Sequence, residues 1–324
     1  MRAQFELLQL LADGTAHSGE DIARALGISR AAVWERVKGL REAGVAIEAS
    51  PQTGYQLRQR FEALNRAEIS GALSAHTRAI VGDIVVHEVT DSTNQQLLGR
   101  SAATDCHAAV ELAEVQTQGR GRHGQRWHAP LGAGICMSLG WRFEAPPATF
   151  PALSLLVGLS ITDVLATLGV ADLGIKWPND IQADGRKLAG ILIESRAEIA
   201  GPVFVVIGIG LNVCLDEVAL AGIDQPAISL AQLGVTDISR NALVAQLVSA
   251  LTADLARFAL EGFTPWQQYW RRYDLLAGQR LRLALPDSVV EGIGAGIDDY
   301  GALVIEMSNG ESKRFVTGRA TISR

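Results

Sequence analysis

Residues 176–194 read KWPNDIQADGRKLAGILIE, and the second half of this stretch decides the fold class of the middle of the chain. From residue 188 it is a short apolar run of the kind that forms a buried strand. Two longer stretches, at residues 151–168 and 240–262, predict helices, the second because leucines recur at every fourth position. Further strands are predicted at residues 84–89, 108–115, 135–141 and 203–213. Residues 66–272 are therefore predicted to form an α+β domain.

Different modules are predicted on either side of this domain. From residue 275 onward, short strands alternate with Gly-rich turns, which is typical of a small β-barrel-like module over residues 275–324. Its strands are predicted at residues 279–285, 289–296, 303–307 and 313–316. Residues 1–62 instead show three short helical patterns followed by a hairpin around a Pro-Gln-Thr-Gly turn. The chain is thus predicted to be an α+β multidomain protein.

The first sixty residues carry the pattern of a winged helix-turn-helix. A Leu-Gly-Ile turn precedes the third helix, and Ser18 and Ser29 are placed to cap the second and third helices. A Ser-capped basic helix after a short turn is how this motif presents a helix to the major groove, and the hairpin supplies a wing. The alternative is a protein-interaction domain with a solvated charged face, and Trp34 is placed either at a DNA backbone or in the packing. The predicted DNA-binding residues are Ser29, Arg30, Arg36, Lys38 and Arg41.

Composition and charge narrow the class of protein. The 324 residues carry 29 Lys and Arg against 35 Asp and Glu, a net charge of −6, with 48% hydrophobic and 20% charged residues. These values exclude a disordered or low-complexity chain and argue against a protein that coats nucleic acid through bulk charge. Within residues 1–60, eight basic groups face seven acidic ones, so DNA affinity is expected to depend on dimerisation more than on the charge of one domain.

The cysteines and apolar segments predict a cytoplasmic protein. Cys106, Cys136 and Cys214 are far apart and odd in number, so they predict buried apolar residues and not a disulfide framework or a zinc site. The N-terminus does not read as a signal peptide, and residues 151–168 are interrupted by Asp163 and too short for a membrane span. A reducing cytoplasm is therefore expected.

Residues 119–124 read GRGRHG and match the dinucleotide fingerprint GxGxxG. The residues that follow, QRWHAP, do not open a helix, which argues against a pyrophosphate at a helix N-terminus. Two arginines between the glycines instead predict a mobile loop, with Trp127 beside it, that brings guanidinium groups onto a phosphate. The alternative is a solvated basic turn. No GxxxxGKS/T motif occurs, which argues against P-loop chemistry.

Lysine is scarce, and its placement is informative. The lysines are Lys38, Lys176, Lys187 and Lys313, and every other basic residue is arginine. A lysine is a compact charge that can follow a moving phosphoryl or carboxylate oxygen, so the pair Lys176 and Lys187 predicts chemistry, with chance clustering as the alternative. Two other motifs, DSTN at residues 91–94 and GIGLNV at 208–213, taken alone predict a capped helix and a core strand with a bulge.

In combination, five motifs resemble those of biotin protein ligases. TDSTN, GRGRHGQRW, KWPNDI, RKLAGILIE and GIGLNV occur in the order found in that family, and the helix-turn-helix before them resembles the bifunctional form that is also the repressor of the biotin operon. The resemblance covers essentially the whole chain. It implies a mixed-sheet catalytic domain like that of class II aminoacyl-tRNA synthetases and an SH3-like C-terminal domain.

The resemblance also implies a reaction and its partners. Such a protein joins biotin to ATP with Mg²⁺, forms biotinyl-5′-AMP and pyrophosphate, and transfers biotin to a lysine of the biotin carboxyl carrier protein of acetyl-CoA carboxylase. Biotinyl-AMP would also act as the corepressor that promotes a homodimer on operator DNA. Two helix-turn-helix units per dimer suit a palindromic operator. The alternatives are a non-enzymatic ligand-sensing transcription factor and a lipoate-type ligase on the same scaffold.

Site residues follow by motif. Catalysis is assigned to Lys187 and Arg122, which stabilise charge on the phosphorus, and to Asp180, which orients the acceptor amine and lies near the Mg²⁺ that accompanies ATP, without a protein metal cage. Leu188 and Ile191 are expected to form an apolar wall. The biotin-binding residues are Ser92, Thr93, Asn94, Gln116, Arg120, Gly121, Arg122 and Lys187. The adenylate-binding residues are Arg120, Arg122, Trp127, Lys176, Asn179 and Asn212.

The loop departs from the family pattern. Well-matched members often read GRGRRGRKW, whereas here His123 and Gln125 stand in place of arginines and Arg126 in place of lysine. Two fixed positive charges are lost, so the loop is expected to retain the adenylate less tightly or to promote dimers less strongly. Ligation is expected to be retained because GRGR is intact.

Overall fold

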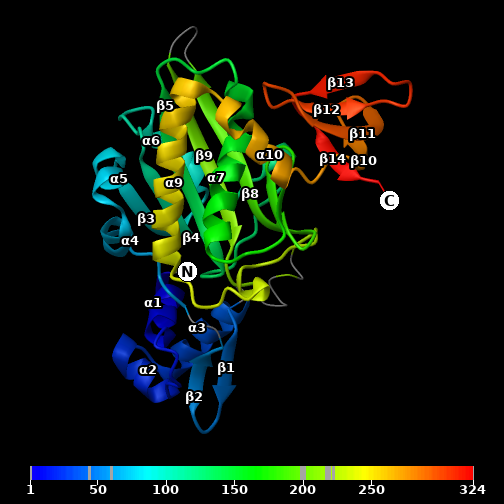
Figure 1. The fold of residues 1–324 in the computed structure, drawn as a ribbon. Helices are drawn as coiled ribbons and strands as arrows, with labels where there is room; N and C mark the ends of the chain where they lie inside the picture. The colour runs from blue at the N-terminus through cyan, green and yellow to red at the C-terminus, as the bar shows by residue number, and fades with distance from the viewer. Residues whose placement is uncertain are drawn as a thin grey trace.

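The computed structural model describes residues 2–42, 45–58, 61–197, 202–215, 220 and 223–323. Three successive parts of the chain each contain a sheet, and we call them the N-terminal module (residues 2–57), the central module (66–273) and the C-terminal module (280–322). In Figure 1 the N-terminal module lies below the central sheet and the C-terminal module lies beside its upper part.

The N-terminal module has the predicted winged helix-turn-helix. Ser18 accepts a hydrogen bond from the backbone of Asp21 at 3.1 Å, and Ser29 accepts one from the backbone of Ala32 at 3.2 Å, so both predicted caps are confirmed. The apolar stripe of the third helix is buried, and the two strands pair as the predicted wing. The elements are α1 (Arg2–Leu11), α2 (Gly19–Leu26), α3 (Arg30–Glu42), β1 (Ile47–Ser50) and β2 (Gly54–Leu57).

The central module is built on a seven-stranded mixed sheet in the order β3-β4-β5-β9-β8-β7-β6. Only β3 and β4 pair in parallel, and all the other neighbours are antiparallel. The strands are β3 (Ile84–Thr90), β4 (Val110–Gln116), β5 (Gly134–Phe143), β6 (Leu173–Lys176), β7 (Asp180–Ala183), β8 (Arg186–Ala197) and β9 (Val203–Asn212). The prediction of an α+β domain is confirmed.

Two long helices, α7 (Leu153–Thr167) and α9 (Arg240–Glu261), lie side by side over one face of this sheet (Figure 1). Side chains alternate along β9, so Val205 and Ile207 join the core beneath these helices while Val206 packs with α6 (Thr93–Arg100) on the other face. The remaining helices are short: α4 (Arg66–Ala72), α5 (Ala75–Ile80), α10 (Gln267–Tyr273) and the 3₁₀ turns η1 (Arg122–Gly124), η2 (Phe150–Ala152), η3 (Ala231–Leu233) and η4 (Thr264–Trp266).

The prediction that residues 151–168 are too short for a membrane span is wrong, because Phe150–Thr167, which joins η2 to α7, is long and apolar enough by length and composition alone, as is α9. Within the fold, 67% of the window Phe150–Thr167 and 50% of Arg240–Glu261 is buried. The two helices pack on each other and on the sheet, which confirms that residues 151–168 form a core helix.

Several short elements were not predicted. Strands β6 and β7 have four residues each, too few for periodicity to resolve, and they exist because their backbones pair with each other and with β8. Helices α4 and α5 begin at Asn65 and Ser74, whose side chains accept hydrogen bonds from the first turn, so a capping signal marks both.

The C-terminal module is a five-stranded antiparallel sheet in the order β13-β12-β11-β10-β14. Two hydrogen bonds attach this part of the chain to the central module. The Trp177 indole donates to the carbonyl oxygen of Gly301 at 3.0 Å, and the backbone N–H of Leu275 donates to the carbonyl oxygen of Ile175 at 3.2 Å. The strands are β10 (Arg280–Ala284), β11 (Val289–Ile297), β12 (Leu303–Glu306), β13 (Ser312–Phe315) and β14 (Arg319–Ile322), the last of which was not predicted.

The segment that joins the N-terminal and central modules is fixed by a buried ion pair. Arg240 and Glu114 approach to 2.9 Å with side chains 5% and 1% exposed, and Arg240 also donates to the carbonyl oxygen of Glu62 at 2.7 Å. Glu114 also accepts a hydrogen bond from the backbone of Leu64 at 2.6 Å. Because Glu114 lies on β4, the connection between modules is tied to a central strand of the sheet.

Candidate functional site

A cavity of about 490 Å³ opens on the face of the central sheet that α7 and α9 leave free, between residues 116–127 and the C-terminal module. Every predicted biotin-binding and catalytic residue lines it, as do all the predicted adenylate-binding residues except Asn212. The structure therefore brings together motifs that lie far apart in the sequence.

Residues 119–127 fold into a hairpin-like loop over this cavity. The backbone of Gly121 donates to Gln125 at 2.7 Å, and that of Trp127 donates to Gly119 at 3.0 Å. The turn passes through left-handed backbone at His123 (φ 53) and Gly124 (φ 74). The loop holds Arg120, Arg122 and Trp127 against the sheet, as the anion-binding interpretation requires.

The loop tryptophan lies on a floor made of two glycines. Gly190 of β8 and Gly210 of β9 are direct partners in the sheet and face the cavity. A Cβ added at Gly210 would meet the Trp127 ring at 2.2 Å, and one at Gly190 would meet it at 3.2 Å. Glycine is therefore required there to admit the indole, whose buried Nε1 has no hydrogen-bond partner among the described residues.

A bulge in β8 aims Lys187 into the cavity. Gln182 of β7 pairs with Lys187 and Ile181 pairs with Ala189, so Leu188 is an extra residue between two paired positions. As a result Leu188 is fully buried in the main core, and the prediction that it forms part of the apolar wall is wrong. Ile191 does line the cavity.

Lys187 is held at the centre of the site. Its Nζ lies 2.7 Å from Asp180 Oδ1 and 5.7 Å from the centre of the Trp127 ring. The side chain is 12% exposed and that of Asp180 is 21% exposed. Asn179 supports this corner through hydrogen bonds with the backbone of Ile191, at 2.8 and 3.0 Å. Asp180 thus positions the lysine as well as facing the cavity.

Positive charge exceeds negative charge in this corner. Burial lowers the pKa of the Lys176 amine, and the cations of Arg319 and Lys187 lower it further while Asp180 opposes them. Burial also lowers the pKa of Arg122. Arg319 lines the cavity, and its side chain forms no hydrogen bond or ion pair with any residue the structure describes. Such a set of cations suits an anionic ligand.

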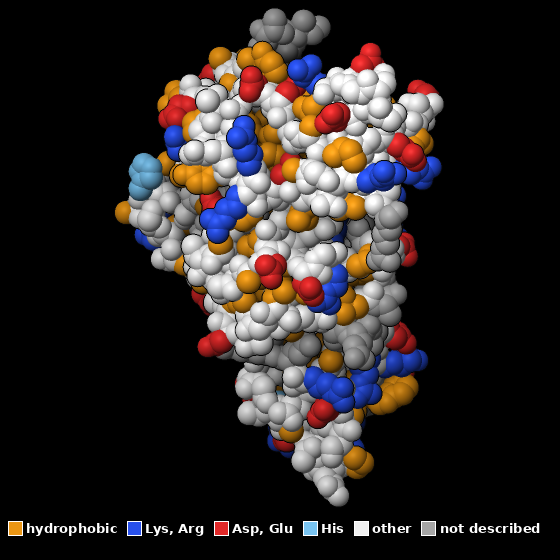
Figure 2. Space-filling view, turned by 45° about the vertical axis from the view of Figure 1, so that its right-hand side comes forward, with side chains coloured by type: hydrophobic (Ala, Val, Ile, Leu, Met, Phe, Trp, Pro, Cys, Tyr) orange, Lys and Arg blue, Asp and Glu red, His pale blue; other side chains and the backbone are white. Residues whose placement is uncertain are grey.

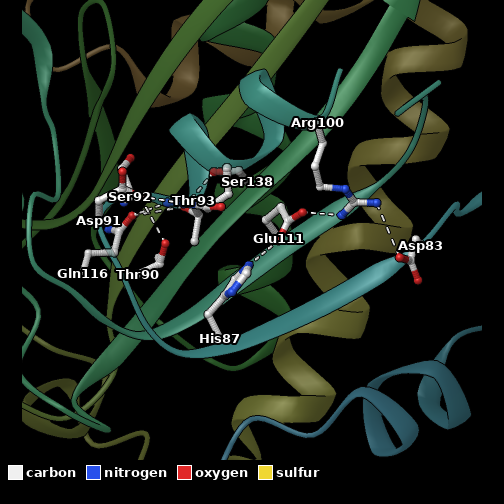
Figure 3. A network of polar contacts seen from close by, with 11 residues as sticks. Asp83, His87, Thr90, Asp91, Ser92, Thr93, Arg100, Glu111, Gln116 and Ser138 are labelled. Carbon is white, nitrogen blue, oxygen red and sulfur yellow. Dashed lines mark hydrogen bonds and ion pairs between the residues drawn. The ribbon is translucent and has the colours of Figure 1, made fainter. Parts of the chain in front are cut away.

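The opposite end of the cavity is polar and neutral. Gln116 Oε1 accepts hydrogen bonds from the backbone of Thr93 at 2.8 Å and from its hydroxyl at 3.2 Å (Figure 3). Ser138 bridges Thr93 Oγ1 and Asn94 Oδ1 at 2.7 and 2.6 Å. Ser92 is only 3% exposed, yet its hydroxyl has no hydrogen bond to a described residue. These groups fit a small polar ring with donors and an acceptor.

The N-cap residue of α6, the helix that carries these residues, is Ser92, but its side chain forms no capping hydrogen bond. The residue before it is Asp91. Its carboxylate accepts from the backbone of Ser92 at 2.6 Å and from Gln96 at 2.9 Å, and these bonds lower the pKa of Asp91. At the other end of α6, Arg100 pairs with the buried Glu111, which His87 also contacts at 2.6 Å (Figure 3). The helix is therefore fixed at both ends.

Glu194 joins the loop to the polar end of the cavity. Its Oε2 accepts from Arg120 at 3.1 Å and from Asn94 at 2.8 Å, while the buried Arg120 Nε has no partner in the part of the chain that the structure describes. Asn212 does not line the cavity. Its side-chain amide donates to the backbone carbonyl oxygens of Lys187 at 3.3 Å and Ile228 at 3.1 Å. Direct contact of Asn212 with an adenylate stays a prediction.

A second cavity of about 280 Å³ adjoins the first and shares Arg122, Trp177 and Pro178 with it. Its remaining lining is mostly apolar and includes the exposed Val316 of the C-terminal module. Among the described residues, no group of three or more His, Cys, Asp or Glu side chains is placed to hold a metal ion. Burial raises the pKa of Cys136 to about 12, so this thiol stays protonated.

The predicted DNA-binding residues divide into two groups. Arg36 pairs with Glu6 at 3.2 Å, and Arg41 donates to the carbonyl oxygen of Ile47 at 2.8 Å, so both are engaged within the N-terminal module. Arg30 is exposed and has no hydrogen bond or ion pair with a described residue, and Lys38 is also exposed, 4.0 Å from Glu42. A DNA contact by Arg36 or Arg41 would require these bonds to break.

Several site residues were missed from the sequence. Ser138 is a fully buried polar residue inside β5, and Glu194 is a partly buried one inside β8, so a polar residue within an apolar strand was the available signal. The C-terminal contribution, residues 284–286 and 317–320, carries no motif and depends on how two modules dock.

Comparison with known proteins places the chain among relatives. Three family models match: an HTH domain at residues 2–56, the Biotin/lipoate A/B protein ligase family at 86–212 and the Biotin protein ligase C terminal domain at 277–320. The chain is 38% identical over 301 residues to the bifunctional ligase/repressor BirA of Escherichia coli K12, covering 93% of this chain and 91% of that protein.

A second relative and a solved structure are also similar to this chain. The BirA protein of Bacillus subtilis is 32% identical over 297 residues, which is 91% of each chain. The structure of the biotin protein ligase from Aquifex aeolicus, solved with biotin and ATP, superposes with a TM-score of 0.61 at 24% identity and covers 75% of this chain and 99% of that chain. That likeness shows a shared fold.

Proposed function

The chain belongs to the biotin protein ligase family in its bifunctional ligase/repressor form, and from this premise we propose that it activates biotin with ATP, transfers biotin to a carrier protein and represses transcription. The observation that carries the ligase proposal is the cavity in which Lys187, aimed by a bulge and held by Asp180, lies between a cationic corner and a neutral polar end.

The neutral end is assigned to the biotin head group. The ureido ring offers two N–H donors and one carbonyl acceptor, which match the free Ser92 hydroxyl and the amide of Gln116. Thr93 and Asn94 hold this pocket in shape, because most of their hydrogen bonds go to Ser138, Gln116 and Glu194. Ile191 and the flat glycine floor leave room for the apolar part of the ligand.

The cationic corner is assigned to ATP. A biotin carboxylate oxygen attacks the α-phosphorus, the new C–O–P anhydride forms, and pyrophosphate leaves. Lys187 and Arg122 stabilise the charge that develops on the phosphoryl oxygens, while Lys176 and Arg319 face the phosphates that depart. Asp180, whose Oδ1 lies 2.7 Å from Lys187 Nζ, is the carboxylate of this corner that would lie near the Mg²⁺ accompanying ATP, and the ion would neutralise phosphate charge there.

In the second step the ε-amine of the acceptor lysine attacks the carbonyl carbon of biotinyl-AMP, AMP leaves, and the amine loses a proton. Asp180 orients this amine once phosphate has drawn Lys187 away from it. The loop over Arg120, Arg122 and Trp127 shields the anhydride from water until the acceptor arrives.

We assign to each of the three modules the fold or role that the resemblance implies. Residues 1–62 are the DNA-binding domain, 66–272 a catalytic domain of the class II aminoacyl-tRNA synthetase type, and 275–324 an SH3-like barrel. Support comes from the mixed sheet beneath two helices and from the five antiparallel strands of the C-terminal module. The acceptor is the biotin carboxyl carrier protein of acetyl-CoA carboxylase, and the compartment is the cytoplasm.

Repression requires DNA binding by α3 and a homodimer formed with biotinyl-AMP. The N-terminal module has a capped, exposed helix beside a wing, as a reader of the major groove requires. Only a dimer presents two such helices to a palindromic operator.

The test is one incubation of the full chain with biotin, MgATP and an apo carrier domain, read by mass. Ligation predicts biotinylated carrier and released AMP. Absence of any AMP adduct would instead favour a non-enzymatic sensor. Competition by lipoate for the same turnover would favour a lipoate-type ligase.

A further inference from the structure

The groove-facing side of α3 carries an aromatic side chain that the proposed function leaves unexplained. Val33, Val37 and Leu40 turn into the core of the N-terminal module. Arg30, Trp34 and Lys38 follow each other at intervals of four residues, so they form one ridge along the outside of the helix.

Trp34 is on the surface and not in the packing. Its side chain is 54% exposed, whereas Trp141, Trp177 and Trp270 are 1–4% exposed. Lys38 Nζ lies 5.6 Å from the centre of the Trp34 ring, so the indole face is already paired with a cation. An indole presented in this way adds apolar surface to a positively charged ridge.

The cations that remain available on α3 are those next to Trp34. Arg36 and Arg41 are engaged with Glu6 and with the backbone of Ile47. Arg30 lacks a partner among the described residues, and Lys38 has only the exposed Glu42 at 4.0 Å. Figure 2 shows basic and hydrophobic side chains side by side on the N-terminal module. A ligand for this ridge must therefore be anionic and offer a small apolar group between its charges.

We infer that Trp34 is a base-reading residue that packs against the 5-methyl group of a thymine in the major groove, while Arg30 and Lys38 contact the flanking phosphates or base edges. Double-stranded DNA offers this combination, because phosphates line the groove and the thymine methyl is its one apolar feature. The N-terminal part of a recognition helix meets the base edges, and Trp34 lies in the second turn of α3. This inference rests on the proposed repressor function.

The test begins with selection of duplexes from a randomised library by the full chain with biotin and MgATP. Each thymine of the selected duplex is then replaced by uracil, which removes only the methyl group. The thymines are replaced one at a time. In each half-site we expect one particular replacement to weaken wild-type binding about fourfold, which is the value of one buried methyl group. Trp34→Ala should bind the thymine and uracil duplexes equally, and Trp34→Phe should keep part of the preference.

Controls separate this inference from the function on which it rests. Tyr300→Ala removes an aromatic side chain of equal exposure, 54%, from another module and should change neither DNA binding nor ligation. All of these variants should biotinylate the carrier normally, because α3 does not line the cavity. Selection of no sequence by the wild type would overturn the repressor function and this inference together. A selected duplex whose uracil versions bind wild type and Trp34→Ala with the same ratio would overturn the inference alone.

Discussion

At the scale of single residues, Lys187 and Leu188 show how one extra residue in a strand changes which side chain meets the substrate. Alternation from Gly190 and Leu192 would put Leu188 in the cavity and send Lys187 into the core, where an unpaired charge is costly. The bulge opposite Ile181 reverses both positions. The rarity of lysine and the family motif were sufficient to predict Lys187, but the position of Leu188 depends on pairing with β7, which no periodicity reveals.

Replacing Lys187 tests the cationic centre of the site. Lys187→Ala should slow biotin-dependent ATP–pyrophosphate exchange by roughly 10²–10³-fold, because it removes a preorganised cation from the developing charge. Lys313→Ala, on an exposed strand of the C-terminal module, is the matched control and should exchange normally. Near-normal exchange in Lys187→Ala would contradict the assignment.

Lys176 should make ATP binding depend on pH. Burial and neighbouring cations lower the pKa of its amine, so the ligand-free protein loses this charge earlier on the alkaline side than an ordinary lysine does. Phosphate favours the charged amine and raises its pKa again, so ATP binding should take up a proton at alkaline pH. The KM for ATP should therefore rise as pH rises through the lowered pKa.

Lys176→Arg gives the control, because arginine keeps its charge throughout this range. It should flatten the alkaline rise in KM and abolish the proton uptake measured by calorimetry in buffers of different ionisation enthalpy. An unchanged alkaline profile in Lys176→Arg would assign the pH dependence to another group.

At the scale of elements, the facing glycines of β8 and β9 have a role that the sequence did not predict. The motif GIGLNV was predicted to be a core strand with a bulge. The core strand is confirmed as the end of β9, but the bulge is wrong, because β9 pairs with β5 and β8 without a register shift. The reason for its glycines lies on another segment. Only the folded loop shows that Gly210 makes room for Trp127. The ends of the long apolar strands were predicted to within about three residues, whereas β6 and β7 depend on their neighbours and were not predicted.

Adding a methyl group to this floor should open the loop. Gly210→Ala would place a Cβ 2.2 Å from the Trp127 ring, so the indole must leave its seat. We expect about a tenfold higher KM for ATP, in line with the usual penalty of overpacking, and faster tryptic cleavage at Arg120 or Arg122. Gly71→Ala meets open space in α4 and should leave both properties unchanged. Wild-type protection from trypsin in Gly210→Ala would contradict this account of the floor.

At the scale of the whole molecule, the site is complete only when the C-terminal module is docked. Residues 284–286 and 317–320 line the cavity, and the bond between Trp177 and Gly301 fixes the module beside the KWPND segment. No single window of the sequence predicts this arrangement, because the contributing residues lie roughly 100 to 140 positions after that segment and carry no recognisable motif.

Arg319 provides a test of this arrangement. Arg319→Ala should raise the KM for ATP about tenfold and leave biotin binding unchanged, because a cation that faces the phosphates is lost. Arg282→Ala, in the same module, removes an exposed arginine that does not line the cavity and should have no effect. Equal effects of the two substitutions would mean that the module acts through stability and not through contact with ATP.

The segment that covers the cavity ends in the core of the N-terminal module. Leu131 belongs to the same hydrophobic cluster as the helices of that module, and Gly132 lets the Phe61 ring approach so closely that a Cβ would lie 2.5 Å from it. A mutation in this short stretch of chain can therefore affect both catalysis and DNA binding. A change tolerated by one activity is still exposed to purifying selection by the other, so this segment is expected to evolve more slowly than surface loops that serve a single role.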